Sequence, residues 1–301
     1  MNHLERIWLM QTPSRMGPAW REAFARACED RGWAFAVHER GEPAPPPDPS
    51  RSQLTVSWLD WFEGQPVTRF YVQRGTADDS PDILARAGDL GPSEALYEGS
   101  LRLAAAELML QNGADLIDMN DEVVTLQGLG DVSRPCEIAV SQLGSDHPLA
   151  LYKSAPLKTG DSIRWPPRVF SYPGLAAAPE DGRIELLGRR RMLFNGPNIF
   201  LPPGRWRLDA EFSINPPART ELLIEWGFGE GARSLSVVIE HPGRYSVSLE
   251  QEWTRVAAAD FRISLMIPAL AGHLDFHGAV VTRIGDYVAP AAPVLEDAAG
   301  A

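Results

Sequence analysis

The chain has 301 residues, 44% of them hydrophobic, and its 28 basic and 40 acidic side chains give a formal charge of −12. This length favours two domains, and this apolar content excludes global disorder. The acidic balance lacks the basic excess that nucleic-acid binding needs, so no nucleic-acid partner is expected. Cys28 and Cys136 are the only cysteines, too few for a metal cluster or a disulfide framework.

The N-terminal part alternates strand-like and helix-like segments. Pro18 and Ser93 open amphipathic helices that end near Arg31 and Gln111. The expected strands are 5–10, 34–38, 54–59, 67–72 and 114–117, with 54–59 and 67–72 as hairpin partners. This order of elements predicts a Rossmann-like three-layer α/β domain over residues 1–144.

Proline, glycine and alternation organise the rest of the chain. Residues 126–135 are a predicted loop, and residues 145–181, with six prolines, are a predicted ordered connector. From 182 to 288, short runs of alternating apolar and polar residues predict an all-β antiparallel jelly-roll sandwich. The Ala/Pro-rich end, 289–301, is expected to fray.

Three segments of the C-terminal half carry a resemblance to known modules: 196–207, 242–247 and 274–279. Their strand-and-turn pattern resembles carbohydrate-binding modules of the jelly-roll type. Such modules accompany bacterial glycan-handling proteins, and some bind sugars on a sheet face, so the resemblance implies saccharide binding. The N-terminal half resembles nucleotide-binding α/β domains of glycosyltransferases, although it has neither a Gly-x-Gly-x-x-Gly motif nor a P-loop.

A candidate anion site lies between the first strand and the first helix. Ser14, Arg15 and Gly17 stand where backbone N–H groups and the helix dipole can hold a phosphate. An ordinary strand-to-helix loop has the same composition, so both interpretations stay open.

A candidate cation site follows the predicted strand at 114–117. Asp118, Asp121 and Glu122 supply carboxylates of the kind that bind divalent cations. A solvated loop is the alternative, so no metal is assigned and no cofactor is expected.

Candidate saccharide-binding residues lie in two places in the predicted sandwich. His273, Asp275 and His277 alternate with apolar residues, so they share one strand face and offer donors and acceptors to sugar hydroxyls, or ligands to a metal. Trp226 and Phe228 lie beside glycines near a turn, where an exposed ring can stack on a pyranose. A solvent-facing strand and a packed core are the alternatives for the two groups.

The function that these patterns favour is a non-catalytic, glycan-associated protein of bacterial polysaccharide recognition or assembly. The alternatives are a nucleotide-sugar-dependent glycosyltransferase-like enzyme and a structural assembly protein. Arg189–Arg191 can grip an acidic glycan or a phosphate, or protect a solvated edge strand. The expected partner is a glycan or polysaccharide, alone or within a homo-oligomer or larger assembly. No signal peptide or membrane span is found, so a cytoplasmic location is expected unless the protein is released within an assembly.

Overall fold

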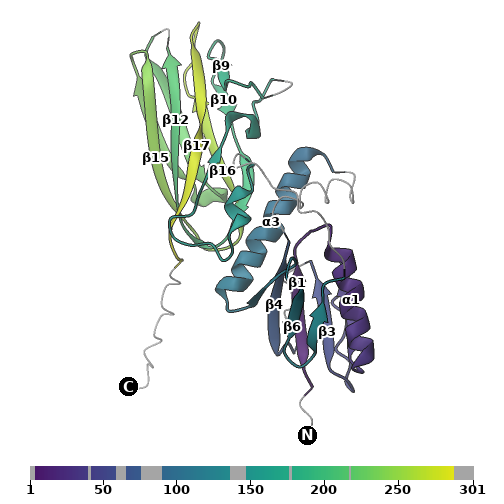
Figure 1. Ribbon diagram of the computed structural model, residues 1–301. Helices are drawn as coiled ribbons and strands as arrows, with labels where there is room; N and C mark the ends of the chain where they lie inside the picture. Colours follow the sequence, from purple (N-terminus) through teal and green to yellow (C-terminus); the bar gives the residue numbers. More distant parts are fainter. Residues whose placement is uncertain are drawn as a thin grey trace, which may run out of the picture.

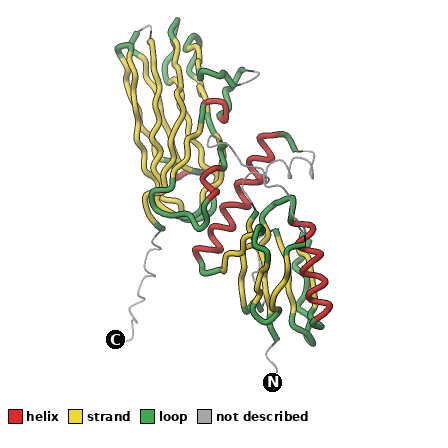
Figure 2. Tube along the Cα trace, viewed as in Figure 1, coloured by secondary structure: helices red, strands yellow, loops and turns green. Residues whose placement is uncertain are grey.

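The chain folds into a parallel sheet and a β-sandwich, with one long helix between them. The computed structural model describes residues 4–39, 42–58, 66–75, 90–135, 147–175, 178–216 and 218–287. Helix α3 (Pro92–Gln111) runs between the two β assemblies (Figure 1). Figure 2 shows this helix in red beside the yellow strands of both.

The N-terminal sheet has the order β2-β3-β1-β4-β5, and every pair of neighbours is parallel. Its strands are β1 (Arg6–Gln11), β2 (Ala34–His38), β3 (Gln53–Ser57), β4 (Arg69–Arg74) and β5 (Asp115–Asp118). The central strand β1 buries four consecutive apolar side chains, Ile7 to Met10. In the sequence, a parallel strand that is covered on both faces appears as a continuous run of apolar residues like this one.

The prediction of a Rossmann-like three-layer α/β domain is wrong. The described residues are mostly β, with 47% in strands and 17% in helices, and they contain two α-helices. Helix α1 (Gly17–Asp30) covers one face of the parallel sheet, and α3 contacts the other. Between β2 and β3 the described part of the connection, 42–52, is Pro-rich and forms no helix, because proline removes backbone donors and fixes φ.

Two local predictions in this region are also wrong. Strands β3 and β4 are not a hairpin, because each pairs in parallel with β1 on opposite sides. The segment predicted as a loop, 126–135, contains β7 (Gly130–Ser133), which forms a hairpin with the preceding β6 (Val123–Leu126). This hairpin packs Val124, Leu126 and Val132 into the core cluster that α1 shares with the sheet. Gly128 lies in the turn between the two strands and Gly130 begins β7, both with positive φ.

The predicted antiparallel sandwich is confirmed in the C-terminal half. One sheet contains β10 (Arg191–Phe194), β11 (Pro197–Leu201), β13 (Thr220–Gly227), β14 (Arg233–Ile239) and β16 (Ala257–Leu265). The other contains β8 (Ser162–Trp165), β9 (Arg183–Glu185), β12 (Gly204–Asn215), β15 (Gly243–Trp253) and β17 (His273–Gly285). Short 3-10 turns are η1 (Ala150–Lys153), η2 (Pro167–Val169) and η3 (Gly229–Gly231).

Aromatic side chains fill the space between the two sheets. In β12 the burial alternates strictly, with Trp206, Leu208, Ala210 and Phe212 inside. Phe194 from one sheet stacks on Phe276 from the other, with ring centroids 4.3 Å apart. Because period-two alternation sends every second side chain inward, the sequence pattern translates directly into this core.

Helix α3 is buried on two sides, which joins the two assemblies. Ala105, Ala106 and Met109 pack on the parallel sheet, while Leu103 and Ala104 belong to the sandwich core. A 20-residue helix with so wide an apolar surface is stable because both of its sides are covered. Among the described helices, none has the length and apolarity that a membrane crossing needs.

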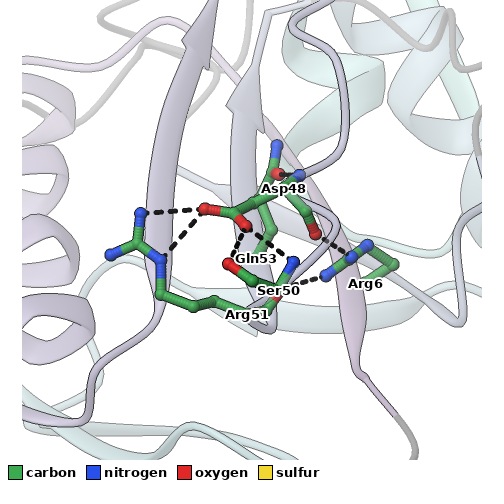
Figure 3. Close-up of polar contacts among 5 residues, drawn as sticks. All are labelled: Arg6, Asp48, Ser50, Arg51 and Gln53. Carbon is green, nitrogen blue, oxygen red and sulfur yellow. Dashed lines mark hydrogen bonds and ion pairs between the residues drawn. The ribbon is translucent and has the colours of Figure 1, made fainter.

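A polar cluster fixes the Pro-rich connector to the start of β3 (Figure 3). The Asp48 carboxylate accepts hydrogen bonds from Ser50 N–H at 2.9 Å, Ser50 Oγ at 2.7 Å and Arg51 Nη2 at 2.8 Å. The Asp48 N–H donates to Gln53 Oε1 at 2.7 Å, and the Arg6 guanidinium donates to the carbonyls of Asp48 and Arg51. Hydrogen bonds from Ser50 and Arg51 hold the pKa of Asp48 well below its usual range.

Replacing Asp48 with asparagine is expected to destabilise the fold at neutral pH and to have little effect in acid. The lowered pKa means that the ionised carboxylate contributes stability above the unfolded-state pKa of about 3.9. This contribution is lost as the pH falls through the folded-state pKa. Urea unfolding of wild type and Asp48→Asn across this range should show a difference that shrinks on acidification. A difference that stays constant with pH would contradict the role of the charge.

Candidate functional site

The three predicted polar residues of β17 do share the outer face of the sandwich, but most of their groups are already paired. Arg183 Nε and Nη2 donate to the two Asp275 oxygens at 2.7 and 3.2 Å, and His273 Nε2 lies 3.6 Å from Asp275 Oδ2. His277 Nε2 lies 2.7 Å from Ser213 Oγ. The hydrogen bonds from Arg183 lower the pKa of Asp275. Saccharide binding by this face stays a prediction.

The predicted aromatic residues do not join this polar face. Trp226 is fully buried between the sheets, so the expectation that its ring is exposed for stacking is wrong. Phe228 is partly buried against Trp253, with centroids 5.4 Å apart. Trp226 lies at the end of β13, and Phe228 follows it directly. The start of β13 is the part that lies near the end of β16, because Leu222 pairs with Leu265. Since His273 follows soon after Leu265 in the chain, Trp226 and Phe228 are at the opposite end of the sandwich from His273. Alternation continues to the end of β13, which keeps Trp226 inside.

The predicted anion site is a tightly packed loop at the carboxyl end of β1. Ser14 is 7% exposed, and its Oγ accepts the Met16 N–H at 3.2 Å. A Cβ on Gly75 would lie only 2.6 Å from Ser14, so the loop after β4 is closely packed against it. Arg15 is exposed, and Gly17 is the first residue of α1. Phosphate binding here stays a prediction.

The predicted cation residues lie in the loop after β5. Asp118 lines a cavity of about 310 Å³ together with Arg74 and Lys153. Its Oδ1 accepts the N–H and Nδ2 groups of Asn120 at 2.8 and 2.9 Å, while Asp121 and Glu122 are exposed. Within the described ranges, no group of three or more His, Cys, Asp or Glu side chains could hold a metal ion.

The structure contains a cleft that sequence reasoning missed. A hollow of about 430 Å³ opens between the start of α3 and the corner Asn195–Asn198, with Arg168–Tyr172 as another wall. A second hollow of about 380 Å³ continues it along α3 and shares Ser93, Pro197 and Asn198 with the first. We call the combined space the α3 cleft.

The β10–β11 corner is held rigidly where it lines the α3 cleft. The Gly196 N–H donates to Asp260 Oδ1 at 2.9 Å, and its carbonyl accepts the Phe261 N–H at 2.8 Å. Asn195 and Ser171 exchange two backbone hydrogen bonds, at 2.8 and 3.0 Å. Asn198 has a positive φ of 60°, a conformation that asparagine tolerates better than most residues. The corner therefore interrupts the strand and presents two amide side chains to the cleft.

Helix α3 supplies the aromatic wall of the cleft. Tyr97 is 42% exposed, and the edge of its ring meets Phe200, with centroids 4.7 Å apart at 75°. Ser100 Oγ accepts the Phe200 N–H at 3.1 Å and donates to the Tyr97 carbonyl at 2.8 Å. Glu94 and Glu98 line the same part of the cleft, and Glu94 Oε2 also accepts the Gly91 N–H at 3.1 Å. Tyr97 is thus fixed from behind while part of its ring faces solvent.

A buried phenol completes the inner wall. Tyr172 is 5% exposed, and its hydroxyl donates to the Pro167 carbonyl at 3.0 Å. Burial raises the pKa of Tyr172, so the phenol stays protonated at physiological pH. The α3 cleft therefore combines a partly exposed ring, two amides, carboxylates and the Arg168 guanidinium. Such groups can hydrogen-bond to a polyhydroxylated ligand and pack on its apolar side.

Comparison with known proteins gives only remote similarities. No protein-family model and no curated protein matches the chain. A family 22 xylan-binding domain from Paenibacillus barcinonensis is similar at 9% identity over 42% of this chain and 97% of that one, with a TM-score of 0.30. A family 61 carbohydrate-binding module with bound β-1,4-galactotriose is 12% identical over 32% of this chain and 66% of that one, with a TM-score of 0.26.

A third similar structure extends over more of the chain. A glycosylation-associated protein complex from Streptococcus agalactiae is 9% identical over 83% of this chain and 49% of its own, with a TM-score of 0.28. TM-scores of this size mark remote likeness, so the ligands of these proteins give no evidence about this one. None of the comparisons supports the predicted nucleotide-binding resemblance of the N-terminal half.

Proposed function

We propose that this protein binds a saccharide in the α3 cleft and acts as a glycan-binding protein rather than as an enzyme. The observation that carries the proposal is the partly exposed ring of Tyr97 beside the Asn198 amide. The apolar face of a pyranose packs on an aromatic ring, while its hydroxyls need donors and acceptors around the rim. The cleft supplies both within one continuous space.

The size and polarity of the cleft suit one or two sugar rings. Its two hollows, of about 430 and 380 Å³, are in the range of small-molecule sites. Asn195 and Asn198 each offer an amide donor and an amide acceptor, which match hydroxyls that donate and accept. Because the walls come from α3 and from the sandwich, the site depends on how the two parts pack.

The outer face of β17 supports saccharide binding less well. Its carboxylate and arginine are engaged with each other, so a ligand would have to replace the hydrogen bonds of Asp275 to Arg183. Trp226, the ring that would have completed this site, is buried in the core. A face of paired charges with no ring beside it gives a sugar little surface on which to pack.

Replacing Tyr97 with alanine is expected to weaken saccharide binding about tenfold or more, because it removes the aromatic packing surface of the second hollow of the cleft. A glycan array identifies the best ligand, and calorimetric titration of the full chain then measures its affinity. Tyr97→Phe keeps the ring and should retain most of the affinity. Asp275→Ala, on the outer face of β17, serves as the control.

Two results would overturn this proposal. One is the absence of binding to any glycan of a broad bacterial panel. The other is an unchanged affinity in Tyr97→Ala together with a loss in Asp275→Ala, which would move the site to the β17 face. Circular dichroism of each variant checks that the fold is intact.

A further inference from the structure

A second surface lies at the end of the sandwich that is remote from the parallel sheet. Two loops meet there, 186–190 between β9 and β10 and 266–272 before β17, at the end where Figure 1 labels β9. Gly188 and Ala269 exchange backbone hydrogen bonds at 2.9 and 3.0 Å. We call the two loops together the sandwich tip.

The sandwich tip has a defined conformation. The Arg191 guanidinium donates to the Leu187 carbonyl at 3.2 Å, to the Leu186 carbonyl at 3.4 Å and to the carbonyl of Glu185. One arginine of the Arg189–Arg191 run is therefore used to organise the loop. Arg189 and Arg190 are exposed at its surface.

Two leucines project from the tip beside these arginines. Leu270 is 88% exposed and Leu187 is 61% exposed, more than any other large hydrophobic side chain among the described residues. The bridge between Leu187 and Ala269 places the two loops, and hence both leucines, next to each other. Keeping large aliphatic side chains in contact with water costs free energy, which would be recovered if an apolar surface covered them.

We propose that the sandwich tip docks on a membrane surface that carries anionic phospholipids. Leu187 and Leu270 insert among the acyl chains just below the headgroups, while Arg189 and Arg190 contact lipid phosphates. The charge of the tip is complementary to such a surface, although the whole chain carries a formal charge of −12. Only this end of the molecule is drawn to the membrane, which leaves the α3 cleft, whose corner lies opposite the middle of β16, open to solvent.

Two other occupants fit the tip less well. A stable protein interface buries about 800 Å² on each partner, far more than two leucines at the end of two loops provide. An acidic glycan would use the arginines, but the two loops contain no aromatic ring on which its sugars could stack. A bilayer surface satisfies both features because its headgroups and acyl chains lie within a few ångströms of each other.

Vesicle flotation of the full chain tests this proposal. The protein should float with mixed phosphatidylserine–phosphatidylcholine vesicles and not with pure phosphatidylcholine vesicles, and high salt should release it. Two double variants, Leu187→Ser with Leu270→Ser and Arg189→Gln with Arg190→Gln, should each bind about tenfold more weakly or worse.

Matched variants elsewhere on the surface provide the controls. Leu116→Ser with Val123→Ser changes two exposed apolar residues of the N-terminal part, and Arg205→Gln with Arg233→Gln removes the same charge from the opposite end of the sandwich. Both should float like wild type. The proposal is overturned if wild type does not float with the mixed vesicles, or if the control pairs lose as much binding as the tip pairs. Salt-sensitive binding to heparin that needs the arginines but not the leucines, without flotation, would instead make the tip an acidic-glycan site.

Discussion

Replacing Trp226 with alanine is expected to lower the free energy of unfolding by about 3–5 kcal/mol, because it opens a large cavity in a closely packed core. Trp226 is fully buried, with the ring of Trp253 at 5.0 Å and that of Trp165 at 6.2 Å between centroids. These three indoles come from different strands, so their neighbours cannot close the gap without moving the strands. Denaturant unfolding measures the loss.

Trp226→Phe separates the volume of this side chain from its polarity. Trp226 Nε1 has no hydrogen-bond partner among the described residues, so a phenylalanine forfeits packing alone and should cost about 1–2 kcal/mol. Phe228→Ala, at a partly buried position, should cost less than Trp226→Ala. If Trp226→Ala kept wild-type stability and lost glycan binding, the ring would be part of a binding site after all.

Replacing Glu107 with glutamine is expected to destabilise the protein by about 3–5 kcal/mol, because it leaves the charge of Arg74 buried without its partner. Glu107 is fully buried, and its Oε1 accepts from Arg74 Nη1 at 2.7 Å. Its Oε2 accepts the Leu157 N–H at 2.9 Å, which links α3 to the segment that precedes β8. Burial raises the pKa of Glu107 and lowers that of Arg74, since desolvation opposes both charges.

A double variant separates the net contribution of the Arg74–Glu107 ion pair to stability from the cost of leaving one of its charges unpaired. Arg74→Met with Glu107→Leu removes both charges and should recover much of the stability, because apolar residues of similar volume often replace a buried ion pair without loss. The exposed pair of Arg244 and Glu211 is the control, and Glu211→Gln should cost much less stability than Glu107→Gln, because solvent screens the exposed pair. Urea unfolding of all four proteins measures these differences. A Glu107→Gln loss as small as that of Glu211→Gln would show that the buried pair contributes little.

The sandwich could be predicted from the sequence because its signal is local. In β12 each alternate residue from Trp206 onward is buried, and the long runs in β13 and β16 behave in the same way. Strand β17 also alternates, but its buried set shifts by one residue at Gly278, where the register is irregular. Side-chain direction in a strand depends only on whether a position is odd or even. The same alternation predicts that Trp226 lies in the core, because it continues the series of buried residues Leu222 and Ile224.

The layers of the N-terminal part could not be predicted in this way. The order of β and α segments suggested a doubly wound domain, but layering depends on what occupies each face of the sheet. One side of α3 packs on the sandwich, and the β6–β7 hairpin covers part of the α1 side. One signal was available in the sequence: residues 103–106 are four consecutive apolar residues, a pattern typical of a helix covered on more than one side. In the structure all four are buried.

The α3 cleft is likewise a product of packing over long sequence distances. Tyr97 and Asn198 are 101 residues apart in the sequence, and neither belongs to a motif with a defined spacing. Gly196 and Pro197 mark a turn in the sequence, but the sequence does not show which element lies across the cleft from it. By contrast, His273, Asp275 and His277 could be placed on one face because a single strand carries them.

A crystal structure of the full chain with its best-binding glycan tests the saccharide site most directly. We predict that a sugar ring lies against Tyr97 in the α3 cleft, with its hydroxyls hydrogen-bonded to Asn198 and Asn195. A ring bound instead on the outer face of β17, at His273, Asp275 and His277, would contradict this account.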